Sequence, residues 1–474
     1  MTQRLEADIC VIGAGSAGLS VAAGASQLGA RTVLIESNKM GGDCLNYGCV
    51  PSKALLAAAH AAQSARQAGR FGLRLPELTV DFAAVQDHVQ GVIGAIAPHD
   101  SQERFEGFGV TVVRAAASFT GPQEVAAGDY SIRARRFVIA TGSTPFVPPL
   151  PGLDKLPYLT NETVFDLRDR PRHLLVIGGG PIGCELAQAF RRLGSEVTVI
   201  EMARLLPKDD PDAVAVVHGR LQAEGVRLLE ETTVLRAEAA ADGVALTLES
   251  KSGPLSISGS HLLIAAGRRP NVTGLNLESA GISAGPQGIA VDAGLRTANR
   301  RVFAIGDAIG GLQFTHAAGY HAGIVIRRAL FRLPAKMNPG AIPWVTYTDP
   351  ELAQAGETEA SARQKGPDVA VTVSPFNRND RAQTERDTDG FVKIVSRRNG
   401  RILGATIVGP HAGELIQVWT LAIACRLKLS AMAGLVAPYP TRGEAGKRAA
   451  GDFYAPRLFS ARTRGVIQFL RLFG

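Results

Sequence analysis

Two cysteines separated by four residues are the side chains in this sequence best suited to chemistry. The segment from Met40 reads MGGDCLNYGCVPSKALLAAAHAAQ, which places the pair at Cys44 and Cys49. A zinc half-site would need a second such pair, and the sequence has none. Pro51 suits the first turn of the helix that follows, so we expect Cys49 just before a helix N-terminus and Lys53 one turn inside. Both features stabilise a thiolate, which favours a labile redox disulfide over an incidental pair in a loop.

The other cysteines favour a protein of a reducing compartment. Cys10, Cys184 and Cys425 lie in apolar sequence surroundings, where cysteine usually behaves as a small buried hydrophobe. The total of 5 cysteines is small and odd. This usage indicates a cytoplasmic protein with one local redox pair, and it argues against a secreted disulfide scaffold.

A repeated pattern supplies the elements that would position this pair. From Asp8 the chain reads DICVIGAGSAGLSVAAGASQLGARTVLIE, and from His173 it reads HLLVIGGGPIGCELAQAFRRLGSEVTVIE. Each copy predicts a strand, a glycine-rich turn, a helix and a second strand that ends in an acid, 23 residues after the first glycine. The two sets are Gly13, Gly15, Gly18 and Glu36, and Gly178, Gly180, Gly183 and Glu201.

Each copy has the full dinucleotide-binding fingerprint. The first glycine permits the turn, the second lets the backbone approach a pyrophosphate, and the third lets helix and strand pack closely. The helix N-terminus supplies N–H donors to the phosphates, and the acid accepts hydrogen bonds from a ribose diol. The repeat therefore predicts two bound nucleotides rather than two unliganded turns.

The two nucleotides are not expected to be equivalent. The redox pair follows the first copy, so the first nucleotide should be the one that stays bound. In the second copy, Glu201 suits a free 2′-hydroxyl and repels a 2′-phosphate, and Gly183 favours the same choice. This predicts NADH. Arg204 could reach a 2′-phosphate, which keeps NADPH as the alternative.

Composition limits the protein class. The 474 residues are 46% hydrophobic and 20% charged, which is enough apolar material for two to four domains. The net charge of +8 is mild, so we expect anionic small ligands and no nucleic acid. No stretch reaches the roughly 18 apolar residues of a membrane span. The apolar run near the N-terminus resembles a signal peptide, but acids precede it and glycines interrupt it, so we expect a strand and turn there.

The redox segment resembles a known family. Cys44-Leu-Asn-Tyr-Gly-Cys49-Val-Pro-Ser-Lys53 is similar to the active-site signature of the class I pyridine nucleotide–disulfide oxidoreductases, which include dihydrolipoamide dehydrogenase, glutathione reductase and mercuric reductase. The resemblance covers nearly the whole chain. It extends to Ala140-Thr141-Gly142, Ala266-Gly267-Arg268-Arg269-Pro270-Asn271, Val302-Phe303-Ala304-Ile305-Gly306-Asp307 and Thr348-Asp349-Pro350-Glu351.

The resemblance implies an α/β fold with two doubly wound, Rossmann-like nucleotide-binding domains and a C-terminal α+β dimerisation domain. Residues 1–150 and 271–342 would form the FAD-binding domain, interrupted by an NAD(P)H-binding domain at 151–270. Residues 343–474 would form the interface domain with a basic amphipathic tail. A homodimer with an active site shared between subunits follows, because the interface domain would reach the partner's Cys44.

The resemblance also assigns cofactors and roles. FAD and NAD(P)H would be the cofactors, with no metal cofactor. Hydride would reach the flavin, and electrons would pass to Cys49, which forms the charge-transfer thiolate, and to Cys44, which meets the substrate. Lys53 would pair with Glu185 near the flavin. The cofactor-binding residues implied are Gly13, Gly15, Gly18, Glu36, Gly42, Lys53, Thr141, Gly142, Gly306, Asp307, Gly178, Gly180, Gly183, Glu201 and Gly267.

One departure from the family concerns the acid/base. Disulfide-reducing members carry a His-Pro motif followed by a glutamate, and here the stretch is Ala437-Pro438-Tyr439-Pro440-Thr441-Arg442-Gly443-Glu444. A phenol with a pKa near ~10 is a poor base compared with an imidazole near ~6.5. Tyrosine here is similar to mercuric reductases, but their C-terminal cysteine pair is missing after Cys425. His316 is expected to be structural, with a role as proton donor as the alternative.

The last segment, residues 453–474, is called the tail here. It alternates arginine with large apolar residues and predicts a basic amphipathic helix. We expect it to dock on its own dimer, with a membrane surface as the alternative. Two functions remain open: an enzyme that reduces a disulfide or a thiol-bound metal, and a redox sensor or electron carrier docked on an assembly or membrane.

Overall fold

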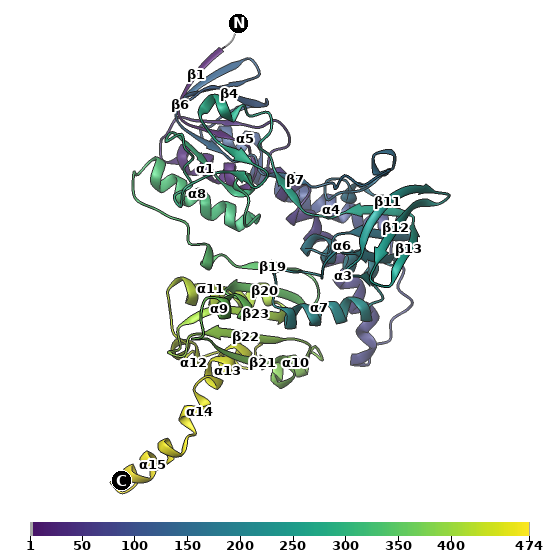
Figure 1. Ribbon diagram of the computed structural model, residues 1–474, viewed down its shortest axis with the longest axis vertical. Helices are drawn as coiled ribbons and strands as arrows, with labels where there is room; N and C mark the ends of the chain where they lie inside the picture. Colours follow the sequence, from purple (N-terminus) through teal and green to yellow (C-terminus); the bar gives the residue numbers. More distant parts are fainter. Residues whose placement is uncertain (1–2, 474) are drawn as a thin grey trace. The chain divides into compact units, whose positions relative to one another are not determined.

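The computed structural model describes residues 3–473, and it contains two units, each described separately below (Figure 1). The first unit comprises Met1–Met202 and Leu228–Met337, and the second comprises Ala203–Arg227 and Asn338–Gly474. Met1, Thr2 and Gly474, which the predicted domain limits include, lie outside the described residues.

A seven-stranded sheet in the first unit carries the first glycine-rich turn. Its order is β3-β2-β1-β6-β5-β4, with β18 paired to β6. The strands β1, β2, β3, β6 and β18 are parallel, and β4 and β5 extend the sheet as an antiparallel meander. The bounds are β1 Gln3–Ile12, β2 Thr32–Ile35, β3 Thr111–Val113, β4 Ala117–Gly121, β5 Glu124–Ala127, β6 Tyr130–Ile139 and β18 Val302–Ala304.

Helices cover this sheet because its central strands are apolar on both faces. All residues of β2 are buried, as are the last four of β1. Helix α1 (Ser16–Gln27) packs against α8 (Thr315–Ala329), and both contribute to one apolar cluster with the sheet. Buried strands without alternation are typical of parallel sheets covered on both sides.

The second glycine-rich turn belongs to a four-stranded sheet in the order β10-β9-β8-β14. The pairs of β8 with β9 and with β14 are parallel. Helix α6 (Pro181–Arg192) follows β8, and a three-stranded antiparallel sheet, β11-β12-β13, completes this part. The bounds are β8 His173–Ile177, β9 Glu196–Ile200, β10 Arg227–Leu229, β11 Thr233–Ala240, β12 Gly243–Ser250, β13 Gly253–Gly259 and β14 His261–Ile264.

Sterics explain the third glycine of each fingerprint. A Cβ on Gly18 would lie 1.8 Å from the carbonyl oxygen of Gly13, and a Cβ on Gly183 would lie 1.9 Å from that of Gly178. Any side chain there would push the helix away from its strand. Gly13 and Gly178 adopt φ values of +104° and +115°, which disfavour residues with a Cβ.

The second unit is built on a five-stranded antiparallel sheet in the order β19-β20-β23-β22-β21. Helices α11 and α13 pack on the sheet around the buried Trp419 and Phe376. The bounds are β19 Trp344–Thr346, β20 Glu351–Gly356, β21 Ala370–Pro375, β22 Phe391–Ser396, β23 Ile402–Gly409, α7 Pro211–Ala223, α9 Glu359–Gln364, α10 Asp380–Thr384, α11 Ala412–Ala424, α12 Leu429–Ala433, α13 Glu444–Asp452, α14 Ala455–Leu458 and α15 Ala461–Leu470.

The predicted fold class is confirmed by these sheets, while the domain limits at 150, 270 and 342 stay predictions. One expectation about cysteine is wrong: Cys10 and Cys184 are buried, but Cys425 is exposed at the C-terminal end of α11. Of the apolar residues near it in sequence, Ala422 is buried in the core, whereas Leu421 and Leu427 are exposed as Cys425 is. Among the described residues, no helix is both long and apolar enough to cross a membrane.

Candidate active site

Both cysteines of the redox pair lie at helix starts in the first unit. Cys44 belongs to the short helix α2 (Gly42–Asn46), which the sequence reading took for a loop. Cys49 is the first residue of α3 (Cys49–Gln67), so this helix begins earlier than predicted, since the sequence placed Cys49 just before it. The structure presents both as thiols, with Cys49 exposed and Cys44 half-buried. The site is therefore described in its dithiol form.

The two thiols have opposite pKa shifts. The Cys44 thiol donates a hydrogen bond to the Cys49 sulfur, and this bond, with help from Thr315 and the charge of Lys53, lowers the pKa of Cys49 to about 6 against the opposing effect of burial. The Cys49 Sγ lies 3.4 Å from Thr315 Oγ1. The same bond and burial raise the pKa of Cys44. Cys49 is thus the thiolate of the pair at neutral pH.

Alkylation of the reduced, flavin-loaded protein should reveal this thiolate. With Cys425 replaced by serine, the rate of iodoacetamide modification at Cys49 should rise with pH around a midpoint of about 6. Below that pH the thiol is protonated and unreactive, and above it the thiolate attacks. In Cys44→Ala the midpoint should move upward because the donated hydrogen bond is lost. A wild-type midpoint close to that of an ordinary cysteine would contradict the assignment.

A lysine and a glutamate from different helices meet beside the thiols. Helix α3 packs against α6, and Lys53 Nζ lies 2.7 Å from Glu185 Oε2. The Glu185 side chain is only 5% exposed, so the alternative of a solvated helix residue is wrong for it. A buried carboxylate of this kind needs its cation, and it holds the lysine ammonium in one place.

The redox helix is attached directly to the first glycine-rich turn. Gly41 donates its N–H to the carbonyl oxygen of Ala14 at 3.0 Å, and Gly15 and Gly41 form a parallel bridge. A Cβ on Gly42 would lie 2.7 Å from the Cα of Gly15. The segment that carries Cys44 therefore rests on the segment predicted to receive a pyrophosphate.

The two fingerprint acids occupy equivalent positions. Glu36 Oε2 accepts the N–H of Ala14 at 2.6 Å, and Glu201 Oε2 accepts the N–H of Gly179 at 2.7 Å. In the described chain, neither α1 nor α6 has a side-chain cap at its N-terminus, so first-turn N–H groups point out of each turn. A Cβ on Gly180 would contact nothing within 4 Å. These features fit a dinucleotide at each turn.

The other predicted cofactor residues cluster on the connections between the two nucleotide-binding parts. Short strands β7 (Ser143–Pro145) and β15 (Arg268–Pro270) pair antiparallel. Thr141 Oγ1 donates to the carbonyl oxygen of Asn271 at 2.6 Å, and Asn271 Nδ2 donates back to that of Thr141 at 3.0 Å. Positive φ values occur at the predicted Gly142, Gly267 and Gly306.

Asp307 lies at the end of this arrangement, in the turn Gly306–Ile309. Its Oδ2 accepts the hydroxyl of Ser143 at 2.6 Å. Burial raises the pKa of Asp307, while the hydrogen bond from Ser143 and the charge of Arg268 oppose the shift. A carboxylate held in this way keeps its second oxygen as an acceptor for a ligand hydroxyl.

Arg268 links these residues to the redox helix, and sequence reasoning missed it. Its guanidinium lies 3.1 Å from Asp43 Oδ1, donates to the Ser143 hydroxyl at 2.7 Å and is only 11% exposed. Asp43 also accepts from Asn161 Nδ2 at 3.1 Å. Asp43 precedes Cys44 directly, so Arg268 couples the domain connection to the redox turn. The motif containing Arg268 was noted, but its partners are more than 100 residues away in sequence.

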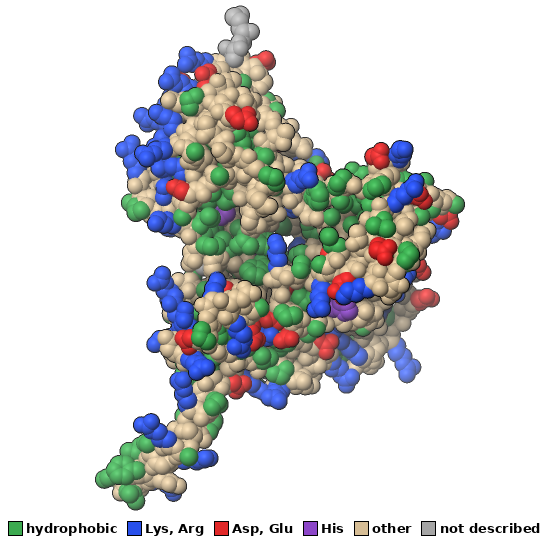
Figure 2. All heavy atoms as spheres, in the orientation of Figure 1, with side chains coloured by type: hydrophobic (Ala, Val, Ile, Leu, Met, Phe, Trp, Pro, Cys, Tyr) green, Lys and Arg blue, Asp and Glu red, His purple; other side chains and the backbone are tan. Residues whose placement is uncertain are grey.

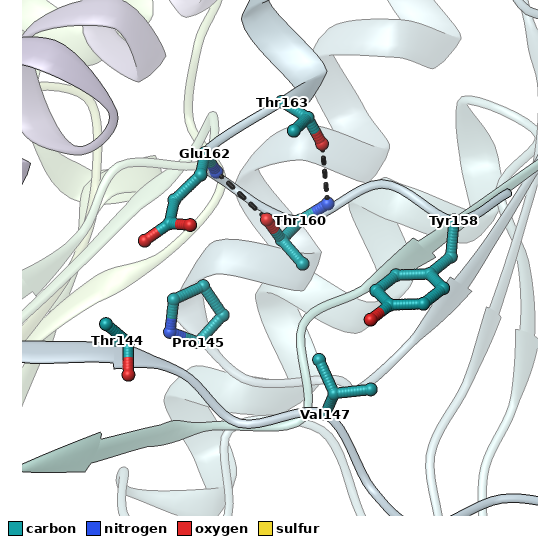
Figure 3. A pocket seen from close by; sticks show the side chains of 7 residues that line it. All are labelled: Thr144, Pro145, Val147, Tyr158, Thr160, Glu162 and Thr163. Atoms are coloured by element: carbon teal, nitrogen blue, oxygen red, sulfur yellow. Dashed lines mark hydrogen bonds between the residues drawn. The ribbon is translucent and has the colours of Figure 1, made fainter. Parts of the chain in front are cut away.

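A pocket of about 370 Å³ opens beside the same connection (Figure 3). Within its wall, Thr160 N donates to the Thr163 hydroxyl at 3.1 Å, and Glu162 N donates to that of Thr160 at 3.2 Å. None of the predicted site residues lines it. The complete lining is Thr144, Pro145, Val147, Tyr158, Thr160, Glu162 and Thr163.

Tyr439 and Glu444 lie in the second unit, where each has a local partner. The Tyr439 hydroxyl donates to Asp380 Oδ2 at 3.0 Å, and this bond raises the pKa of the phenol. Glu444 begins α13, and its Oε2 accepts the N–H of Thr441 at 3.1 Å. His316, in the first turn of α8, stacks on Phe314 with ring centroids 5.4 Å apart.

The described residues contain no group of three or more histidine, cysteine or acidic side chains placed to hold a metal ion. The chemistry that the residues of this site support is that of a thiol pair. A thiolate, a vicinal thiol and a fixed ammonium lie next to the glycine-rich turn predicted to bind a dinucleotide, which is an arrangement suited to passing electrons between such a nucleotide and a sulfur acceptor.

Comparisons with known proteins support the same conclusion. The family model of pyridine nucleotide-disulphide oxidoreductases matches residues 7–322, and its dimerisation domain matches residues 342–450. The chain is 36% identical over 454 residues to a mercuric reductase of Streptomyces lividans, covering 94% of this chain and 96% of that one. It is 35% identical over 456 residues to a dihydrolipoyl dehydrogenase of Geobacillus stearothermophilus, with the same two coverages.

A solved structure is also similar along almost the whole chain. The Cu(II) complex of the HOCl-induced flavoprotein disulfide reductase RclA from Escherichia coli superimposes with a TM-score of 0.83 and 28% identity, covering 93% of this chain and 98% of that one. The family uses FAD and NAD(P)H, and the dimerisation domain supports a homodimer. This chain belongs to the pyridine nucleotide-disulphide oxidoreductase family and is an NAD(P)H-dependent disulfide oxidoreductase similar to dihydrolipoyl dehydrogenase and mercuric reductase.

Proposed function

We propose that this enzyme uses NADH to reduce a soft metal ion bound by thiolates, with Cys44 and Cys49 as the relay of electrons. One observation carries the choice of acceptor: Tyr439, at the position of the family's histidine, donates its hydroxyl to Asp380 and has a raised pKa. The phenol is therefore protonated at neutral pH and does not act as a base. Among the relatives, the mercuric reductases and the copper-bound RclA are consistent with a metal substrate.

The bonds that are broken explain why the missing base favours a metal. Reduction of a disulfide by NADH breaks an S–S bond, and the thiolate leaving group of the exchange step must be protonated at the active site. Reduction of one thiolate-bound Hg(II) to Hg(0), or of two Cu(II) to two Cu(I), uses the same two electrons but breaks metal–sulfur bonds, and the released thiolates take up their protons in solution. Only the first reaction needs a general acid, which typically contributes ~10²–10⁴-fold.

The first fingerprint and Asp307 would hold FAD, and the second fingerprint would hold NADH. Bound FAD would supply hydride acceptance from the nicotinamide and electron transfer to sulfur. Backbone N–H groups fix both acids at the ends of their strands, where a ribose diol would bind: Glu36 accepts from Ala14 and Asn38, and Glu201 accepts from Gly179. A carboxylate at Glu201 favours NADH, and the exposed Arg204 keeps NADPH as the alternative.

The thiols and the residues around them would each have a separate role in electron transfer. Cys49 would be the thiolate beside the flavin, since its pKa of about 6 keeps it ionised at neutral pH. Cys44, with its raised pKa, would exchange with the acceptor. Lys53, held by Glu185, would place a fixed positive charge next to the thiolate. Tyr439 and Glu444 would complete this site across a homodimer, near the partner's Cys44.

The test is anaerobic reoxidation of the NADH-reduced enzyme, followed through the thiolate-to-flavin charge-transfer absorbance. Lipoamide, oxidised glutathione and thiol-complexed Hg(II) or Cu(II) are offered in turn. Fast reoxidation by a metal complex alone is the expected result. Fast reoxidation by either disulfide would overturn the proposal, because it would place an effective acid elsewhere.

Replacing Tyr439 by histidine should give the enzyme a disulfide reductase activity. Glu444 lies close enough for its charge to contribute to the raised pKa of Tyr439, so an imidazole at position 439 would have a carboxylate near it. We expect lipoamide turnover to rise by about 10²-fold or more. NADH reduction of the flavin should not change, which serves as the internal control. An unchanged lipoamide rate would show that the missing histidine is not the obstacle.

A second candidate function is a docked electron carrier or redox sensor. The helix α15 favours it, because none of its residues is buried in the described structure. Steady turnover of purified enzyme on a small acceptor would decide for the first function.

A further inference from the structure

The tail forms two helices that leave the rest of the second unit (Figure 1). After α14, Ser460 caps α15 by accepting the N–H of Thr463 at 3.2 Å. The large apolar side chains of α15 and the two residues after Arg471 are between 50% and 77% exposed. They are Val466, Ile467, Phe469, Leu470, Leu472 and Phe473. A capped helix that exposes this much apolar surface indicates a binding surface.

The side chains of α15 fall on two faces, except that Arg462, in the first turn, shares the face of the apolar residues. Val466, Phe469, Leu470 and Phe473 follow the i, i+3, i+4, i+7 spacing of one helix face. The rings of Phe469 and Phe473 are in contact, with centroids 5.2 Å apart. Arg464, Gln468 and Arg471 repeat at i, i+4, i+7 on the opposite face. Figure 2 shows the resulting apolar end of the tail with basic side chains along it.

The charge of the tail identifies the kind of surface it fits. Residues 453–474 contain 4 arginines and no aspartate or glutamate. A second copy of the tail would carry the same positive charge and would repel it. A surface that is apolar just below a layer of negative charge complements both faces of α15 at once, and an anionic lipid bilayer has this structure.

The length of α15 and the end of the family match both agree with attachment of the tail to a membrane surface. Helix α15 has 10 residues, too few to span a bilayer and few enough to be marginal alone in water. The match to the dimerisation domain ends at residue 450, so the tail is additional to the part that the family uses for dimerisation.

We propose that the tail is a membrane-surface anchor that lays the apolar face of α15 into an anionic bilayer, with Arg464 and Arg471 at the phosphate level. The sequence alone favoured docking on the dimer; the wholly basic charge of the tail and its place beyond the matched dimerisation domain change that preference. This inference does not depend on the identity of the electron acceptor.

Vesicle co-sedimentation of the full-length, FAD-loaded enzyme tests the proposal. Vesicles of phosphatidylcholine with one-third phosphatidylglycerol should pellet the enzyme, and pure phosphatidylcholine vesicles should not. Binding should weaken as salt is raised, because the attraction to the lipid charge is screened. Equal binding to both vesicle types, or to neither, would overturn the proposal.

Paired substitutions separate the two faces. Arg464→Gln with Arg471→Gln should weaken the partition by roughly 30-fold, since each arginine near an anionic surface contributes about a fivefold factor. Phe469→Ser with Phe473→Ser should abolish it. Matched controls change exposed residues of the first unit. Arg74→Gln with Arg133→Gln is the control for charge, and Phe71→Ser with Leu73→Ser is the control for apolar surface.

Analytical ultracentrifugation of the same variants tests the alternative that the tail docks on a second copy of the chain. The tail variants should remain dimers and should oxidise NADH at the wild-type rate, which shows that they are folded. Conversion of dimer to monomer, together with no vesicle binding by the wild type, would assign the tail to a second copy of the chain. Failure of metal reduction would leave the binding assay unaffected, so the two proposals fail separately.

Discussion

Replacing Cys49 by serine should reduce NADH-driven turnover by a factor of about 10³ or more, with flavin reduction intact. A serine hydroxyl is not ionised at neutral pH, whereas the Cys49 thiol has a pKa of about 6. The variant should therefore accept hydride and stop there, and the charge-transfer band of the reduced enzyme should be absent. Stopped-flow absorbance of the flavin and of that band, under anaerobic conditions, measures both steps.

The control for this substitution is Cys425→Ser, which removes the other exposed thiol. Cys425 lies at the end of α11 in the second unit and should leave both steps unchanged. If Cys49→Ser retained acceptor reduction, electrons would pass from flavin to acceptor without the thiol pair. That outcome would remove the basis for assigning any role to Cys44.

Lys393→Met should destabilise the second unit by about 3–5 kcal/mol. Lys393 Nζ lies 2.8 Å from Asp210 Oδ1 and 2.5 Å from Asp212 Oδ2, and the side chains of Lys393 and Asp210 are 3% and 1% exposed. The substitution keeps the volume of the side chain but leaves a buried carboxylate without its cation. The lysine joins β22 to the start of α7, so the contact between these two elements should be the first to be lost on unfolding.

Tryptophan fluorescence during urea unfolding measures the effect, because both tryptophans of the chain, Trp344 and Trp419, belong to the second unit. Lys365→Met is the matched control. It breaks the ion pair with Glu357, in which the lysine is 69% exposed, and should cost at most about 1 kcal/mol. Asp210→Asn should recover part of the loss in Lys393→Met, since asparagine also caps a helix. An unfolding midpoint equal to that of the control would contradict the account.

The parts of the site that could be predicted are those encoded locally. The fingerprint turns followed from glycine spacing and a terminal acid, and the Cβ contacts of Gly18 and Gly183 give the steric reason. The thiolate at Cys49 followed from its place at a helix start next to Lys53. In each case the residues that matter lie within one strand–helix–strand unit, at most 23 residues from the first glycine, or within one turn of a helix.

The remaining contacts depend on segments distant in sequence. Arg268 stood in a motif without a role, because its partners Asp43 and Ser143 meet it only through the pairing of β7 with β15. Thr315 lies 266 residues from Cys49 and contributes to its pKa. Nothing in the local sequence of Asp380 indicated that it would bind the Tyr439 hydroxyl.

The contact between Gly42 and Gly15 has a consequence for how such an enzyme can diverge. The turn for the pyrophosphate and the turn that presents Cys44 share one backbone contact, so a mutation that enlarges either turn displaces the other. Selection for a new electron acceptor can therefore not reshape the redox turn without losing the cofactor. Changes of acceptor must arise on surfaces supplied by other segments, and under the proposed function the tyrosine at position 439 is a change of that kind.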